Sequence, residues 1–247
     1  MDDAYGRRYA DLYRRHWWWR AREETIVEVL AGLRPDAHWG AVLDIGCGDG
    51  LFFDRLSVLG EVEGVEPDAG LVSDDGPWRD RIHVRPFDAS FDTGRRYGLI
   101  VMLDVLEHLA DPVRALRHAR SLLAPGGRMV LTVPAFRVLW TRHDEINHHV
   151  TRYTRAGLVR QARRAGLEVS EARYFFHWLF PVKLAVRAKE RLLGAGDTLP
   201  AVPPRWINAA AYRLSRLEAA VATPLGLPFG TSLLAVLSVA AVEPPPA

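Results

Sequence analysis

Cysteine is nearly absent from this sequence, since Cys47 is the only one among 247 residues. A single thiol excludes an intramolecular disulfide and a zinc site built from several cysteines. Long apolar runs are absent as well, because the longest, near 232–242, is too short to span a bilayer. The N-terminus is polar and charged through Arg15, which does not fit a secretory signal. These features predict a soluble, cytoplasmic protein.

Charge is distributed unevenly along the chain. Residues 1–150 carry 19 basic and 24 acidic side chains, whereas residues 151–247 carry 13 and 6. Lysine is rare, because arginine supplies every basic residue except Lys183 and Lys189. A basic C-terminal part favours an anionic acceptor or an anionic lipid surface as partner, although an ordinary solvated arginine-rich face is the simpler explanation. The net charge of only +2 and the lack of a recognition motif argue against a nucleic-acid partner.

Short apolar segments alternate with segments of helical periodicity. Five apolar segments have the length of buried strands: 41–45, 61–65, 82–87, 97–103 and 128–133. Helices are expected at 22–33, 51–59, 112–123 and 154–165, and two later strands at 167–176 and 232–239. A loop at 134–153 and broken helical stretches across 178–230 complete the pattern. This order predicts an α/β fold, namely a Rossmann-like, doubly wound, mainly parallel seven-stranded sheet with a helical C-terminal elaboration.

A glycine loop follows the first expected strand. Glycine recurs there at every second position (Gly46, Gly48, Gly50). Such a loop lets the backbone turn tightly and approach a ligand. A dinucleotide fingerprint would need a glycine where Leu51 stands, and Asp44 at the strand end would repel a pyrophosphate. A cationic ligand, such as S-adenosylmethionine (SAM) with its sulfonium and amino groups, is favoured instead.

Two further acids follow the next two expected strands. Glu66 lies 20 residues after Gly46, where an acid can bind both hydroxyls of a ribose. Asp88 follows the third strand, where it can accept a hydrogen bond from an adenine amino group. Each acid alone is more often a surface carboxylate. Acids at successive strand ends beside a glycine loop indicate a nucleoside-binding edge of the sheet.

Five motifs occur in the order found in class I SAM-dependent methyltransferases, which the chain resembles over roughly residues 42–134: DIGCGDG, GVEPD, FDAS, DVLEHLADP and LLAPGGRMVLTVP. The resemblance implies SAM as cofactor and S-adenosylhomocysteine as product. It implies that the glycines wrap the methionine part, that Glu66 binds the ribose, that Asp88 binds the adenine amino group, and that Leu103 and Asp104 border the reacting methyl. The expected cofactor-binding residues of the core are Asp44, Gly46, Cys47, Gly48, Gly50, Glu66, Pro67, Asp88, Ala89, Leu103 and Asp104.

Three segments outside this core give a narrower resemblance. Residues 16–22 (HWWWRAR), 148–154 (HHVTRYT) and 228–232 (PFGTS) are similar to a bacterial subgroup that also resembles ubiquinone-biosynthesis O-methyltransferases. Val150 and Thr151 replace part of the basic stretch usual in that subgroup. The resemblance implies a small-molecule, glycan or lipid-linked acceptor and fixes no single substrate.

No linker interrupts the chain, so we expect residues 1–247 to form a single methyltransferase domain. Its expected parts are an N-terminal helical cap (1–40), a SAM-binding core (41–134), an acceptor-side loop and helical elaboration (135–230) and a closing strand (231–242).

Histidines gather where an acceptor is expected to bind. Methyl transfer is an in-line displacement, and a hydroxyl acceptor also needs a base that removes its proton. His149 and His148 are the leading candidates, and His108 is a third. The alternative is that these residues brace the loop while Arg152 pairs with an acid. The histidine spacing suggests no metal site.

The sequence is also compatible with reactions other than O-methylation. N-methylation of a small amine needs less proton abstraction, so the loop histidines would then matter little. The third possibility is a SAM-binding enzyme that does not transfer the methyl group. A nicotinamide-dependent oxidoreductase is disfavoured by Leu51 and Asp44.

An unusual aromatic run occurs at 17–19, where three tryptophans are adjacent. Three neighbouring residues cannot share one helical face, so we expect one or two to pack inward and one, with Trp19 as the candidate, to lie near the cofactor. Arg22 or Arg20 is a candidate ligand for the SAM carboxylate, and a surface ion pair is the alternative.

Residues 174–188 mix aromatic and basic side chains. They are expected to form an acceptor lid or a peripheral membrane contact, or else a packing helix or a dimer surface. The chain is therefore expected to be a monomer or homodimer, and to be cytoplasmic, with peripheral membrane contact as the alternative.

Overall fold

The computed structural model describes residues 10–33, 38–194, 201–222 and 225–239. Seven strands form one sheet: β1 (Ala41–Ile45), β2 (Glu61–Glu66), β3 (Ile82–Val84), β4 (Tyr97–Leu103), β5 (Leu123–Pro134), β6 (Leu167–Phe175) and β7 (Ser232–Val239). Their order across the sheet is β3-β2-β1-β4-β5-β7-β6. The first five strands are parallel, and β7 is antiparallel to both of its neighbours. The predicted Rossmann-like, mainly parallel, seven-stranded sheet is confirmed.

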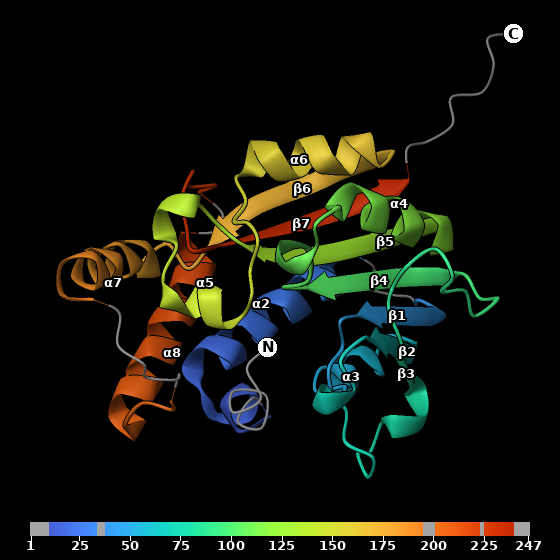
Figure 1. The fold of residues 1–247 in the computed structure, drawn as a ribbon, viewed down its shortest axis with the longest axis horizontal. Helices are drawn as coiled ribbons and strands as arrows, with labels where there is room; N and C mark the ends of the chain where they lie inside the picture. The colour runs from blue at the N-terminus through green and yellow to red at the C-terminus, as the bar shows by residue number, and fades with distance from the viewer. Residues whose placement is uncertain (1–9, 34–37, 195–200, 223–224, 240–247) are drawn as a thin grey trace, which may run out of the picture.

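Helices cover both faces of this sheet (Figure 1). α4 (Pro112–Leu122) and α6 (Arg155–Arg164) lie on one face, whereas α2 (Trp17–Leu33) and α3 (Phe53–Leu56) lie on the other. α8 (Arg205–Val221) packs against α2. α5 (Arg142–Ile146) and α7 (Leu179–Leu193) lie beyond the ends of the parallel strands. Among the residues described, none of the helices has the length and apolar character that crossing a bilayer requires.

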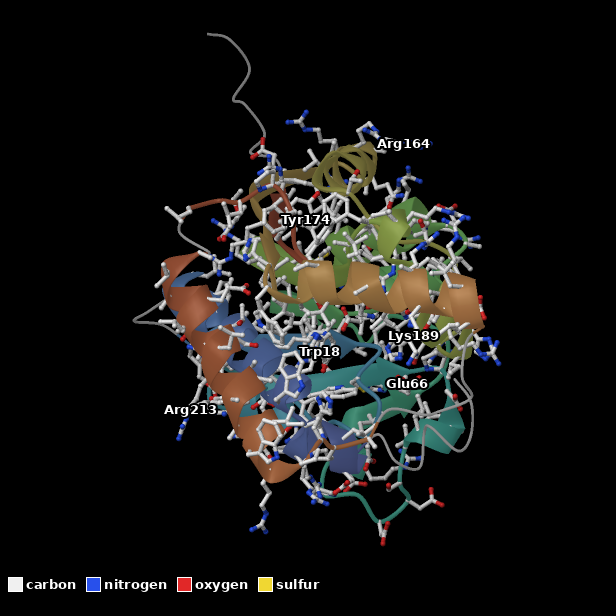
Figure 2. All side chains as sticks on the ribbon, turned by 90° about the vertical axis from the view of Figure 1, so that its left-hand side faces the viewer. Trp18, Glu66, Arg164, Tyr174, Lys189 and Arg213 are labelled. Carbon is white, nitrogen blue, oxygen red and sulfur yellow. The ribbon has the colours of Figure 1, made fainter. Side chains whose placement is uncertain are left out.

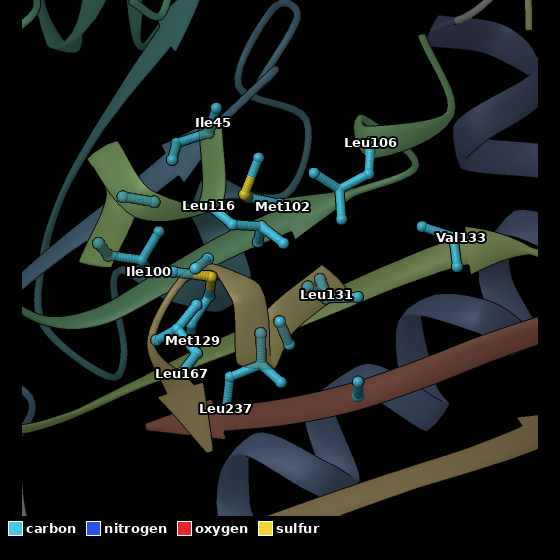
Figure 3. Packing of buried hydrophobic residues seen from close by; sticks show 14 of the residues in the cluster. Ile45, Ile100, Met102, Leu106, Leu116, Met129, Leu131, Val133, Leu167 and Leu237 are labelled. Atoms are coloured by element: carbon cyan, nitrogen blue, oxygen red, sulfur yellow. The ribbon is translucent and has the colours of Figure 1, made fainter. Parts of the chain in front are cut away.

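The core consists of two apolar layers, one on each face of the sheet. In β4, Ile100 and Met102 pack on the side of α4, and Figure 3 shows them beside Leu116 of that helix. Leu99 and Val101 belong to the layer on the side of α2. Successive side chains of a strand point to opposite faces, so a central strand covered on both faces must be apolar at every position. This explains the uninterrupted apolar run that identified β4 in the sequence.

Strand boundaries follow the prediction to within one residue except in β3 and β5, where proline or glycine intervenes. β1, β4 and β7 have the predicted limits. β3 ends at Val84 instead of residue 87, because Pro86 has no N–H to continue the ladder. β5 begins at Leu123 rather than at 128, and its pairing with β4 passes from Tyr97–Leu123 to Leu99–Arg128 around the irregular segment 124–127.

Two predicted helices, 112–123 and 154–165, match α4 and α6 to within one residue at each end, and the other two were less accurate. α2 begins at Trp17, five positions before the predicted start, and the helix predicted at 51–59 is only the four-residue α3. The predicted loop at 134–153 contains α5, whose start is fixed by a capping box in which Asp144 accepts a hydrogen bond from the Thr141 backbone. Parts of the expected cap and closing strand, including 34–37 and 240–242, lie outside the described residues.

Candidate active site

The glycine loop lies at the carboxyl end of β1. Gly46, Gly48 and Gly50 all have positive φ, the region that favours glycine. A Cβ on Gly46 would lie 2.6 Å from a methyl group of Val105, so the packing there excludes any side chain. A Cβ on Gly48 would meet nothing within 4 Å, which leaves room for a ligand against the loop. The Gly48 backbone N–H donates to Glu66 Oε2 over 2.9 Å and ties the loop to the end of β2.

Two buried carboxylates border this loop. Asp44 and Glu66 are only 3% and 5% exposed. Burial raises the pKa of Asp44 to about 8, opposed by the Arg22 guanidinium and reinforced by Glu66. Burial also raises the pKa of Glu66, although the N–H groups of Asp68 and Gly48 oppose it. Two desolvated acids beside an open loop suit a ligand that brings positive charge, and this donor set fits SAM.

Because a cationic ligand favours the ionised form of Asp44, the affinity for SAM is expected to depend on pH. Asp44 is mostly protonated below pH 8, and a sulfonium or ammonium favours its carboxylate. SAM affinity is therefore expected to rise from about pH 6 to about pH 8, by up to about tenfold per pH unit, and then to level off. Calorimetric titration across this range measures the effect. Asp44→Asn should flatten the profile, and an equal slope in that variant would contradict the assignment.

Other cofactor candidates are more exposed. Pro67, Asp88 and Ala89 are exposed beyond the ends of β2 and β3. The Asp88 side chain accepts hydrogen bonds from the backbone and hydroxyl of Ser90, which hold its pKa below the ordinary value. Cys47 is half-buried, and burial raises its pKa, so it is a neutral thiol that packs beside the loop. The binding roles of these residues stay predictions.

Arg22 connects α2 to the ends of β4 and β5. Its Nη2 lies 2.8 Å from Asp104 Oδ2 and donates to the Thr132 hydroxyl over 2.9 Å. Thr132 donates in turn to Asp104 Oδ1, and Asp104 has a φ of 59°. Arg22 is buried and Asp104 is half-buried, so this ion pair is not the surface pair considered from the sequence. The Arg22 guanidinium thereby holds Asp104 in place, directly after the half-buried Leu103.

The tryptophan run divides as its spacing predicts. Trp17 and Trp19 are buried, whereas Trp18 is half-buried. Trp19 packs against His16, while the ring of Trp18 lies 5.6 Å from the Arg22 guanidinium. Figure 2 views the molecule from the side on which the parallel strands end and shows Trp18 below α7. Trp18 is thus the tryptophan that contacts Arg22, and the predicted role of Trp19 beside the cofactor stays a prediction.

The acceptor-side loop is organised around Asp144, which is completely buried. Its Oδ1 lies 2.9 Å from His149 Nδ1 and accepts a hydrogen bond from Arg152 Nε over 2.7 Å. Arg152 Nη2 donates to the second oxygen, and Nη1 donates to the Ala135 carbonyl. Burial alone would raise the pKa of Asp144, but the bonds from His149 and Arg152 hold it well below its ordinary value. An ionised Asp144 requires Nδ1 of His149 to carry a proton, which leaves Nε2 as the ring's acceptor.

Two hydrogen bonds to backbone carbonyls, one from a backbone N–H and one from a side chain, hold this loop against the segment that follows β4. The Val150 N–H donates to the Glu107 carbonyl, and the Tyr153 hydroxyl donates to the Leu106 carbonyl. The His149 and His108 rings are consequently 4.9 Å apart and nearly perpendicular. His108 is exposed, but desolvation of its ring and the nearby His149 lower its pKa to about 4, so the ring is neutral at physiological pH.

Glu107 is the site residue that the sequence did not single out. It is completely buried, and neither carboxylate oxygen has a hydrogen-bond partner among the described residues. Burial and the neighbouring Asp104 raise its pKa well above the ordinary value. One oxygen of Glu107 and one ring nitrogen each of His108 and His149 lie within 4.8 Å of one another, a separation that a divalent cation can bridge. The motif DVLEH contained this acid, but its burial depends on tertiary packing.

His148 differs from its neighbour. It is exposed, has a φ of 55° and donates its backbone N–H to the Glu145 carbonyl. Among the described residues, none forms a hydrogen bond with the His148 ring, whereas Asp144 forms one with the His149 ring. Among the three predicted catalytic histidines, His149 is therefore the one whose ring is oriented by a carboxylate.

The aromatic side chains of 174–188 point inward. Phe175 and Phe176 are buried, and Phe180 packs between Phe136 and Phe229. Arg187 donates to the Trp140 carbonyl, so α7 is anchored to the acceptor-side loop. This packing favours a lid or packing helix for the aromatic side chains of this segment.

Comparison with known proteins agrees with this geometry. The family model described as "Methyltransferase domain" matches residues 9–172. The ubiquinone biosynthesis O-methyltransferase of Azorhizobium caulinodans is 32% identical over 129 residues, which are 49% of this chain and 47% of that protein. The chain thus spans about half the length, or less, of the curated relatives it matches.

Solved structures support the fold. A methyltransferase of Haloferax volcanii, solved as a complex with the Trm112 methyltransferase activator, superimposes with a TM-score of 0.59 at 20% identity, covering 98% of this chain and 97% of that one. An S-adenosylmethionine-dependent methyltransferase of Clostridium acetobutylicum gives a TM-score of 0.57 at 9% identity, with 90% and 92% covered. With the family model, the motif order and the acidic glycine-loop site in agreement, the chain belongs to the methyltransferase domain family.

Proposed function

We propose that this chain methylates an oxygen atom of a small-molecule, glycan or lipid-linked acceptor, with His149 as the general base. The observation that carries the proposal is the bond between His149 Nδ1 and the buried, ionised Asp144. This bond orients the ring and leaves Nε2 able to take a proton from a hydroxyl. The curated relatives named O-methyltransferases add support, although their similarity covers only part of each chain.

The residues around the cofactor have separate tasks. Asp44, Glu66 and the glycine loop hold SAM, which supplies an electrophilic methyl group. Arg22 holds Asp104, and with it the end of β4, at the mouth of the site. His149 removes the acceptor proton as the oxygen–carbon bond forms and the sulfur–carbon bond breaks. The negative charge of Asp144 stabilises the imidazolium that results.

Arg152 acts through Asp144 and is a positioning residue. It donates two hydrogen bonds to the carboxylate and one to the Ala135 carbonyl, so Asp144 cannot rotate away from His149. Positioning of this kind is a large part of catalysis, because the base and the acceptor must meet in one geometry.

A labelling experiment tests the atom methylated. Purified protein is incubated with methyl-labelled SAM and a panel that pairs phenols, sugar alcohols and prenylated phenols with the corresponding amines. We expect label in hydroxyl acceptors. Label confined to amines would replace this proposal with N-methylation, and SAM binding with turnover of no acceptor by a folded protein would favour a non-methylating use of SAM.

A further inference from the structure

The outward face of α8 is apolar. Its exposed apolar residues recur at helical spacing along one stripe: Trp206, Ala210, Leu214, Leu217 and Val221. Trp206 is 75% exposed and Leu217 is 62% exposed. The opposite face, with Ser215, is the one that packs inward. A surface helix normally has the reverse pattern, with its apolar residues toward the core, and none of the residues that the structure describes covers this stripe.

α7 has a second stripe of the same kind. Val182, Val186 and Leu193 are exposed and separated by one and two turns, with Lys189 between the last two. The inward face of α7 is already used, because Phe180 and Arg187 contact the acceptor-side loop. Figure 2 shows both helices on the side of the molecule that faces the viewer, with Lys189 on α7 and Arg213 on α8. We call the two stripes together the outer apolar face.

The charges around the outer apolar face are positive. Lys189 and Arg213 lie within the stripes, and neither forms an ion pair with a described residue. The acidic side chains Glu218 and Glu190 form hydrogen bonds within the chain. Glu218 bonds the His177 ring, and Glu190 accepts a hydrogen bond from the Arg142 backbone N–H. An apolar face that carries basic side chains complements the apolar interior and negative headgroups of an anionic bilayer.

We propose that the outer apolar face binds the surface of an anionic lipid membrane. A second copy of the chain is a poorer occupant, because a two-fold contact through this face would bring Lys189 and Arg213 toward the same charges of the other copy. The residues that would contact the membrane are those of the outer apolar face, and they do not include the aromatic side chains of 174–188, which point inward. It places the edge of the sheet that carries the candidate active site next to the bilayer, where lipid-linked acceptors would be found. The surface contact itself does not depend on which atom is methylated.

Vesicle flotation tests this proposal without SAM or acceptor, so its result is separate from that of the proposed function. The protein is mixed with phosphatidylcholine vesicles, with or without phosphatidylglycerol, at low and high salt. We expect it to float with the anionic vesicles and to be released partly by salt. Leu217→Glu should weaken binding by roughly tenfold or more, because a leucine that inserts into the bilayer is replaced by a charge. Arg213→Gln should weaken it roughly fivefold and reduce the salt dependence.

Val58→Glu is the matched control, because Val58 is 76% exposed but lies outside α7 and α8. Thermal unfolding and S-adenosylhomocysteine titration establish that all variants are folded. The proposal is overturned if the wild type does not float with anionic vesicles, or if Leu217→Glu floats as well as Val58→Glu. A concentration-dependent dimer that Leu217→Glu abolishes would also overturn it, by showing that a second copy covers the face.

Discussion

Replacing His149 with alanine is expected to lower kcat for a hydroxyl acceptor by about 10²- to 10⁴-fold, the usual contribution of a positioned general base. The affinity for SAM should change little, because the His149 contacts are with Asp144 and His108 rather than with the glycine loop. Steady-state kinetics with a saturating acceptor, together with SAM titration, measure both quantities.

His148→Ala is the internal control for this prediction. His148 is adjacent in the sequence but exposed, and Asp144 bonds the ring of His149 instead. We expect His148→Ala to retain most of the activity. Equal losses in the two variants would assign the effect to the loop as a whole and would contradict a specific role for His149.

Asp144→Ala is expected to reduce the free energy of unfolding by about 3–5 kcal/mol, because it leaves the buried Arg152 charge without its partner. The same substitution removes the hydrogen bonds that fix the start of α5 and the ring of His149. Urea unfolding of the wild type and the variant gives the difference. Activity should fall as well, even at temperatures where the variant remains folded.

Glu145→Ala is the matched control for Asp144→Ala. Glu145 is the next acid along the chain, and its ion pair with Arg142 is about half exposed on both sides. Exposed pairs of this kind contribute about 0–1 kcal/mol, so little change is expected. A similar loss in the two variants would contradict the account of a buried ion pair.

The Asp144 contribution has a defined pH dependence. The folded-state pKa of Asp144 is lowered, so its stabilisation is complete above the unfolded pKa of about 4 and is lost as the pH falls below that value. The difference between wild type and Asp144→Ala should therefore shrink in acid. A difference that grows as the pH falls would contradict the sign of this linkage.

Much of the fold could be predicted because buried parallel strands leave a simple pattern. β1 and β4 are covered on both faces and flanked by glycine or charge, so the apolar run coincides with the strand. The short elements were harder to predict. α5 has only five residues and lacks an apolar stripe, and its main local signal is the capping box formed by Thr141 and Asp144.

The candidate site was predictable where it follows strand ends and less so where it depends on packing. Asp44 and Glu66 could be placed because the carboxyl ends of parallel strands share one edge of the sheet. The sequence placed His148 and His149 in one loop but could not distinguish them, since only the His149 ring is directed toward Asp144. Trp18 and Glu107 depend similarly on side-chain direction and burial, which spacing alone does not determine.

The most direct test of the central claim compares a hydroxyl acceptor with its matched amine, in wild type and in His149→Ala, under single-turnover conditions. An amine that is already neutral needs no base before it attacks, whereas a hydroxyl must lose its proton. The account predicts that His149→Ala loses methyl transfer to the hydroxyl and largely retains transfer to the amine. Equal retention of both, or equal loss of both with SAM binding intact, would contradict the assignment of His149 as the general base.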